Sequence, residues 1–151
     1  MTAAPDTRAD PCIFCTAPDS RQPSPLLLFR GRHCYVVLNK FPYSNGHLLI
    51  VPCRHVRALA EANADELNEL MALTQRAERV LAEAYAPHGF NVGMNLGRPA
   101  GAGVPGHVHV HVVPRWDGDT NFMTVTAGTR VIPEDPDETV RRLRPLFGRK
   151  A

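Results

Sequence analysis

Residues 107–113 have the sequence His-Val-His-Val-His-Val-Val, and Pro114 follows them. Successive side chains of an extended strand point to opposite faces of a sheet, so the three histidines should share one face and the alternating valines the other. An imidazole is largely neutral near pH 7 and can then act as a nucleophile or a metal ligand. The stretch therefore predicts a half-buried strand with a functional histidine face. The alternative is a polar face whose histidines only contact water.

Composition limits the classes of protein that the chain can belong to. The 151 residues fit one domain, and the net charge of +2 has no long run of either sign. Residues 1–10 contain no apolar core, and the longest apolar runs are far too short to span a bilayer. We therefore expect a cytoplasmic protein without nucleic-acid or membrane partners. In that compartment, four cysteines indicate metal binding or packing instead of disulfides.

One long helix is predicted in the middle of the chain. Asn63 and Glu66 have the spacing of a capping box, and apolar residues recur at helical spacing after them. An amphipathic helix is therefore expected over residues 64–86. Its apolar series is Leu67, Leu70, Met71, Thr74, Ala77, Leu81, Ala84 and Tyr85.

Strands are predicted on both sides of this helix. Residues 47–51 are apolar without alternation, which indicates a central strand covered on both faces. The sum is an α+β domain with a mainly antiparallel sheet, one long helix and a short C-terminal helix. The other expected elements are a mobile leader at 1–11, a hairpin of strands 26–29 and 33–38, strands at 90–96 and 122–125, a glycine-rich loop at 97–106 and a final helix at 140–147.

The histidine stretch resembles the His-φ-His-φ-His-φ-φ signature of the histidine triad (HIT) superfamily, where φ is an apolar residue. Asn39, Gly46-His47 and the run Asn95-Leu96-Gly97-Arg98-Pro99-Ala100-Gly101 look like further landmarks of this family in the expected order. The family consists of nucleotide hydrolases and transferases that act at the α-phosphorus. The resemblance implies one HIT domain over residues 12–151, with its core at 12–122 and a tail at 123–151.

The resemblance implies that His109 is the nucleophile and forms a nucleotidyl-histidine intermediate, which water or phosphate resolves. The other ring nitrogen of His109 must keep its proton, so we expect a backbone carbonyl to accept from it. His111 is expected to hydrogen-bond the phosphate or the leaving oxygen, although it could instead be a buried histidine with its own partners. His47 matches a family histidine that supports the triad.

The resemblance also implies a nucleotide pocket. The loop at 97–106 is expected to bind phosphate through backbone N–H groups, with glycines in left-handed torsions; a flexible linker is the alternative. Because Ala102-Gly103 replaces a Gln-Ser pair of many relatives, the loop must rely on backbone donors. Asn39 and Asn95 match positions that contact ribose and phosphate, but either could be a turn asparagine. The nucleotide-binding candidates are Asn39, Asn95, Gly101, Gly103, Val104, Phe14, Val37 and Trp116, with core packing as the alternative for Phe14 and Val37.

The pair Cys12-x-x-Cys15 is half of a zinc site, and His55 with His107 would complete four tetrahedral ligands. Bacterial triad proteins and the related galactose-1-phosphate uridylyltransferases use a similar set, so the resemblance implies one closed, structural Zn²⁺ per chain. On this interpretation His107 anchors the catalytic strand. The alternative is two buried thiols beside a solvated His55.

The run at 115–122 resembles the group that cleaves dinucleoside polyphosphates such as diadenosine tetraphosphate, by phosphorolysis or hydrolysis. Trp116 could stack on a second adenine, including one across a dimer interface, or it could equally anchor that interface. A homodimer follows family habit, and Mg²⁺ could accompany the polyphosphate. A purine nucleoside phosphoramidase is the alternative within the family, and a non-catalytic nucleotide-binding sensor is the alternative of another class.

Overall fold

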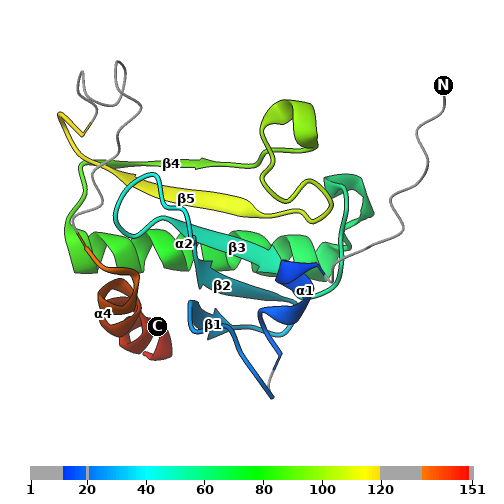
Figure 1. Ribbon diagram of the computed structural model, residues 1–151, viewed down its shortest axis with the longest axis horizontal. Coiled ribbons are helices and arrows are strands. Elements are labelled where there is room, and N and C mark those ends of the chain that lie inside the picture. The colour runs from blue at the N-terminus through cyan, green and yellow to red at the C-terminus, as the bar shows by residue number, and fades with distance from the viewer. Residues whose placement is uncertain (1–11, 20, 120–133, 150–151) are drawn as a thin grey trace.

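The computed structural model describes residues 12–19, 21–119 and 134–149, and its elements form a five-stranded sheet with helices on both faces (Figure 1). The predicted α+β fold with one long helix and a C-terminal helix is confirmed. The leader at 1–11 and the strand at 122–125 lie outside the described residues. In chain order the elements are α1 (Ile13–Thr16), β1 (Leu27–Arg30), β2 (Cys34–Leu38), β3 (Leu48–Pro52), α2 (Ala64–Tyr85), β4 (Gly89–Gly93), β5 (Val110–Arg115) and α4 (Pro136–Gly148), with 3₁₀ turns at Leu59–Glu61 and Arg98–Ala100.

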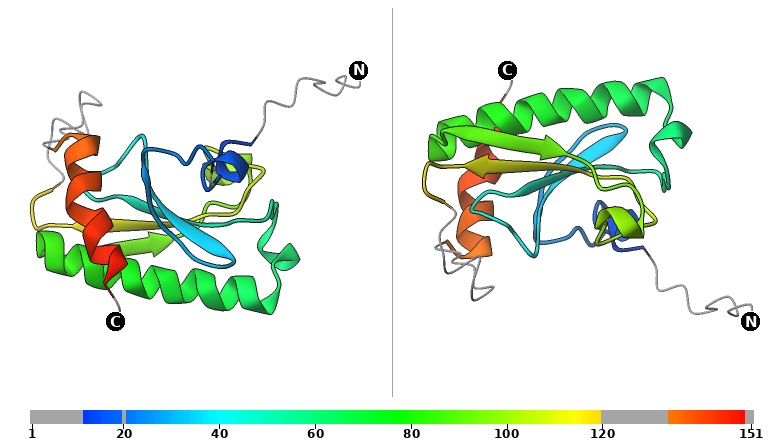
Figure 2. Two further views of the ribbon diagram at one scale, coloured as in Figure 1. Left: turned by 90° about the horizontal axis from the view of Figure 1, so that it is seen from below. Right: turned by 90° about the horizontal axis from the view of Figure 1, so that it is seen from above.

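The sheet has the strand order β1-β2-β3-β5-β4, and every neighbouring pair is antiparallel. Helix α2 lies along one face, and the short helix α1 lies on the other (Figure 2). Helix α4 joins the α2 side, where its residues pack into the larger of two hydrophobic clusters. No helix among the described segments is long and apolar enough to cross a membrane.

Strand β3 confirms the prediction of a strand covered on both faces, because all five of its residues are buried. Leu48 and Ile50 belong to the cluster beneath α2 and α4. Leu49 and Val51 belong to a smaller cluster on the opposite face, which contains Phe14 of α1. The alternation of β3 therefore divides two apolar layers, and the smaller layer lies on the side of α1.

Helix α2 begins at the predicted capping box and ends one residue before the predicted boundary. The Asn63 side chain accepts from the Glu66 backbone N–H, and the Glu66 carboxylate accepts from the Asn63 N–H, both at 2.9 Å. The expected apolar face is partly wrong, since Leu67 and Met71 are exposed. Leu73 and Val80, which the predicted series omitted, are buried instead.

The histidine strand starts later than predicted and continues past its predicted end. Regular pairing begins at Val110, and Pro114 lies inside β5, opposite Phe90 of β4. On the other side of β5, pairing with β3 ends at Val112. Pro114 therefore has no ladder partner there, and its missing N–H costs no hydrogen bond.

Two further boundaries differ from the sequence prediction. Strand β4 spans residues 89–93 instead of 90–96. Helix α4 starts four residues before the predicted position, because the Asp135 side chain caps it and Pro136 occupies its first turn.

Candidate active site

The three histidines predicted to be catalytic lie together on the α1 side of the sheet. The ring centroids of His109 and His111 are 4.9 Å apart, and those of His47 and His111 are 5.1 Å apart. Val110 and Val112 point into the opposite apolar layer, so the predicted division of faces is confirmed. His47 comes from the turn before β3, which places it beside β5.

One hydrogen bond and burial fix the protonation state of His109. Its Nδ1 lies 2.8 Å from the backbone carbonyl of His107, which can only accept, so Nδ1 carries the proton. The expected carbonyl partner is thus present, and Nε2 keeps its lone pair. The side chain is only 4% exposed, and this burial lowers the pKa of His109 below its usual range. His109 is therefore a neutral imidazole with one basic nitrogen at neutral pH.

The proton positions of His47 and His111 follow from the backbone in the same way. The Tyr43 N–H donates to His47 Nδ1 at 3.1 Å, so the proton of His47 is on Nε2. That nitrogen lies 2.9 Å from His111 Nδ1, which must accept. The proton of neutral His111 is therefore on Nε2, a buried atom with no hydrogen-bond partner among the described residues. This N–H remains available to donate to a ligand beside His109.

Tyr43 also contacts both supporting histidines through its ring, and sequence reasoning missed it. The ring is parallel to that of His111 within 8°, at a centroid distance of 6.0 Å. Ser44, the next residue, donates to the carbonyl of Pro114 at 2.9 Å and fastens the turn to β5. The only signal in the sequence was an aromatic residue four positions before His47, within a run of turn-forming residues.

The four predicted metal ligands form one cluster. Their ligand atoms all lie within 4.8 Å of one another. His107 Nδ1 is 3.3 Å from Cys12 Sγ and 3.7 Å from Cys15 Sγ, while His55 Nδ1 is 3.2 Å from Cys15 Sγ. Tetrahedral coordination with typical Zn–S and Zn–N bonds separates sulfur and nitrogen ligands by roughly 3.5 Å. These residues could therefore hold a metal ion.

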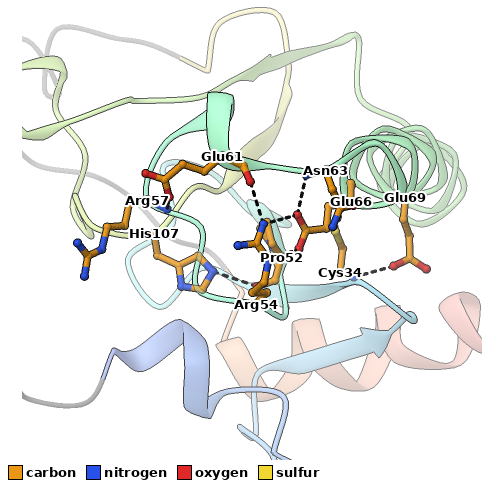
Figure 3. Close-up of polar contacts among 9 residues, drawn as sticks. All are labelled: Cys34, Pro52, Arg54, Arg57, Glu61, Asn63, Glu66, Glu69 and His107. Atoms are coloured by element: carbon orange, nitrogen blue, oxygen red, sulfur yellow. Dashed lines mark hydrogen bonds and ion pairs between the residues drawn. The ribbon is translucent and has the colours of Figure 1, made fainter.

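The orientation of His107 agrees with a metal at this cluster. His107 Nε2 lies 3.0 Å from the carbonyl of Pro52 (Figure 3), so Nε2 carries the proton. Nδ1 faces the two thiols as a ligand. Desolvation and the neighbouring Cys12 raise the pKa of the Cys15 thiol. Two adjacent thiolates need a positive charge close by, which a divalent metal supplies.

His107 connects the metal cluster to the catalytic cluster. Its ring faces the cysteines, and its carbonyl accepts the Nδ1 proton of His109. Phe14 of α1 packs against both imidazoles, at centroid distances of 5.7 Å from His107 and 5.0 Å from His109. The position of His107 therefore sets the orientation of His109.

The torsions predicted for the glycine-rich loop need one correction. Only Gly97 and Gly101 of the loop have positive φ, so Gly103 and Gly106 do not need glycine for their torsions. The backbone N–H groups of Gly103, Val104 and Gly106 have no hydrogen-bond partner among the described residues, whereas those of Gly101 and Ala102 bond within the loop. Three backbone donors thus remain for an anion.

The other candidate side chains already make packing contacts or hydrogen bonds within the protein. Phe14 and Val37 are buried in the smaller hydrophobic cluster, and Val104 packs against it. The Asn39 amide faces His47 while its oxygen accepts from the Phe41 N–H. The Asn95 amide donates to the Gly101 carbonyl at 3.3 Å, which ties it to the loop.

Trp116 is not brought to the histidines of its own chain. It follows β5, five residues beyond His111, which corresponds to roughly 16 Å along an extended strand. Its backbone N–H donates to Asp119 at 3.1 Å in a turn at that end of the sheet. Trp116 therefore lies beyond the end of β5 that is remote from the histidines.

The chain belongs to the HIT domain family, whose model matches residues 21–118. It is 45% identical over 147 residues to an AP-4-A phosphorylase of Mycobacterium tuberculosis, and the match covers 97% of this chain and 75% of that protein. A HIT-like protein of Methanocaldococcus jannaschii is 33% identical over 88% of this chain. A zinc-bound histidine triad family protein from Mycobacterium smegmatis has a similar structure, with a TM-score of 0.74, 28% identity and coverage of 91% and 94% of the two chains.

Proposed function

We propose that this protein is a dinucleoside polyphosphate phosphorylase that cleaves substrates such as diadenosine tetraphosphate at the α-phosphorus. One observation carries the proposal: His109 has a proton-bearing Nδ1 bound to a carbonyl and a basic Nε2, next to the N–H of His111. The 45% identical phosphorylase supports the choice of substrate class and of phosphate as the acceptor.

The reaction would proceed in two displacements. Nε2 of His109 attacks the α-phosphorus, an N–P bond forms, and the bond to the bridging oxygen breaks. The leaving nucleoside polyphosphate departs as an anion, and the His111 N–H stabilises its charge by a hydrogen bond. The carbonyl of His107 holds the Nδ1 proton of the positively charged nucleotidyl-histidine. Phosphate then attacks phosphorus, breaks the N–P bond and releases a nucleoside diphosphate, whereas attack by water would release a monophosphate.

Nucleotide contacts are proposed for the residues around this centre. The N–H groups of Gly103, Val104 and Gly106 would bind phosphate oxygens, together with Gly101 at the turn. Asn39 and Asn95 would contact ribose and phosphate, and Phe14 and Val37 would line the adenine pocket beneath the histidines. Mg²⁺ could accompany the polyphosphate.

We propose Zn²⁺ as the ion held by Cys12, Cys15, His55 and His107. Two thiols and two imidazoles are the donor set that zinc prefers in closed structural sites. When bound, the ion would neutralise the thiolates and fix the ring of His107. Its contribution to the reaction would be indirect, because His107 presents the carbonyl that orients His109.

We further propose a homodimer. Strand β4 is an edge strand of the sheet, and Val92 on it is an exposed apolar side chain. An exposed strand edge is a ready template for pairing with another chain. Trp116 lies at the end of the neighbouring strand β5, where a second chain could bring it near a site other than its own.

A rapid-quench experiment tests the proposed function. Wild-type protein mixed with diadenosine tetraphosphate should form an acid-labile nucleotidyl adduct, and steady-state turnover with phosphate should yield nucleoside diphosphate. The His109→Ala variant should keep the fold yet lose the adduct and several orders of magnitude in kcat. A variant within tenfold of wild type would overturn the assignment of the nucleophile. Turnover only of phosphoramidates would favour the phosphoramidase, and no adduct with any nucleotide would favour a sensor.

A further inference from the structure

The segment 52–56 carries three groups on which the metal cluster and the histidine strand depend. The Pro52 carbonyl accepts from the His107 ring, His55 faces Cys15, and the Val56 carbonyl accepts from the Val108 N–H at 2.8 Å. Only Pro52 of this segment belongs to a strand, and His55 is exposed. The Cys53 N–H donates to the His33 carbonyl at 2.7 Å, which fastens the start of the segment, but this bond does not reach the exposed His55.

Arg54 ties this segment to the start of helix α2. Its guanidinium makes a two-pronged contact with Glu66, with Nε–Oε1 and Nη2–Oε2 distances of 2.8 Å. Nη2 also donates to the Glu61 carbonyl at 2.9 Å. Figure 3 shows Arg54 directed toward Glu66 and Asn63 at the first turn of the helix.

Glu66 is suited to be the fixed partner of this contact. It is 3% exposed and belongs to the first turn of α2, where the helix dipole favours negative charge. The same carboxylate accepts from the Asn63 N–H in the capping box. Hydrogen bonding from Arg54 lowers the pKa of Glu66, so the carboxylate is charged at neutral pH. The planar fork of arginine matches a carboxylate with two parallel bonds, which lysine cannot reproduce.

We propose that Arg54 is a positioning residue for the metal site: its fork on Glu66 holds residues 53–56 so that His55 stays at the cysteines. The inference rests on the metal site proposed above. Arg57, three residues later, provides a natural contrast. Its side chain points away from Arg54 and Glu66 (Figure 3), and only its backbone N–H contacts Glu61.

The test is the affinity of the full-length protein for Zn²⁺, measured by competition with a chromophoric chelator. Arg54→Gln should weaken binding about tenfold or more, the usual cost of losing a residue that orients a metal ligand. Arg57→Gln should bind as wild type does. Asn63→Ala removes the side-chain half of the capping box in the same helix and controls for loss of helix stability; it should leave the affinity unchanged. Cys12→Ser removes a metal ligand, so its affinity for Zn²⁺ shows how weak binding becomes when the site is incomplete.

A double-mutant cycle separates positioning of His55 from general loosening of the fold. In a His55→Ala background the residue to be positioned is absent, so Arg54→Gln should have little further effect. An equal loss of affinity in both backgrounds, or none in either, would overturn the proposal. Should Arg54→Gln fail to fold, Arg54→Lys keeps the ion pair but not the fork, and an affinity equal to wild type would count against positioning.

The same measurements distinguish this inference from the metal site on which it rests. Wild-type protein that binds no Zn²⁺ would remove the metal site and this role of Arg54 together. Wild-type binding that Arg54→Gln leaves intact would remove only the role of Arg54. The activity proposed for His109 is tested separately by its nucleotidyl adduct.

Discussion

His111 is a neutral imidazole that the fold keeps from taking up a second proton. Burial, and then the nearby His109, lower the pKa of His111 below its usual range. His47 and the Tyr43 ring are its other close neighbours, and the His47 N–H already donates to its Nδ1. Protonation would add a hydrogen to Nδ1, which would then face the hydrogen that His47 donates. The hydrogen bond from His47 to His111 should therefore be lost when His111 becomes charged.

This arrangement makes stability depend on pH in a definite direction. Below about pH 6.5 the unfolded chain protonates His111 while the folded chain resists, so the unfolded state binds more protons. The free energy of unfolding should consequently fall as the pH drops from 6.5 through the lowered pKa, and the loss should be absent above 6.5. Urea titrations at several pH values measure this free energy, and it should change less with pH for His111→Asn than for wild type. An equal change with pH in both proteins would mean that His111 does not titrate in this way.

The sequence predicted which histidines form the site, but not which of their ring nitrogens carry the protons. The two-residue period placed His109 and His111 on one face, and their rings are indeed adjacent. Which nitrogen carries each proton depends on the His107 carbonyl and the Tyr43 N–H, and both are backbone groups. Backbone groups carry no side-chain signal, so these partners only became visible in three dimensions. Arg54 was missed for a similar reason, since its partners lie on another element.

The hairpin of β1 and β2 illustrates how one element is fastened by another. Glu69 of α2 accepts from three successive backbone N–H groups in the turn, those of Arg32, His33 and Cys34. Although burial alone would raise the pKa of Glu69, these donors lower it below its usual range. The carboxylate therefore binds the turn as an anion in a ring of N–H groups.

Glu69→Gln should destabilise the protein by roughly 1 kcal/mol, because a partly buried N–H donor would lose its charged acceptor. An amide has one acceptor oxygen, so its NH₂ group must face at least one of the three N–H donors. Glu78→Gln, an exposed position on the same helix, serves as the matched control and should have little effect. Chemical denaturation measures the free energy of unfolding of both variants. If the two variants were equally stable, Glu69 would be an ordinary surface carboxylate.

Element boundaries were predicted well where local chemistry determines them. The capping box located the start of α2 because both of its hydrogen bonds join residues three apart. The end of β5 was predicted wrongly because proline usually stops a strand, whereas here the neighbouring strand β3 has already ended at that point. The bounds of β5 depend on pairing with two other strands, β3 near its start and β4 up to its end, which no local pattern reports.

At the scale of the whole molecule, the sheet keeps the metal cluster and Trp116 at opposite ends of β5. The sequence suggested that Trp116 could stack on a second adenine, and its place roughly 16 Å along the strand from His111 makes a site shared between two chains one arrangement for that role. Trp116→Ala should then impair cleavage of diadenosine tetraphosphate far more than cleavage of a nucleoside phosphoramidate, which has no second base. Equal effects on kcat/KM for both substrates would assign Trp116 to structure.

Mixing two inactive variants tests whether Trp116 acts across chains. In a heterodimer of His109→Ala with Trp116→Ala, the chain that keeps His109 would receive Trp116 from its partner, so one site of the two would be complete. Activity toward the dinucleotide should rise after the variants are mixed and allowed to exchange subunits, toward about half of the wild-type value per mixed dimer. Sedimentation must show a dimer under the same conditions. A monomer, or a mixture no more active than its parts, would rule out a site completed by the second chain.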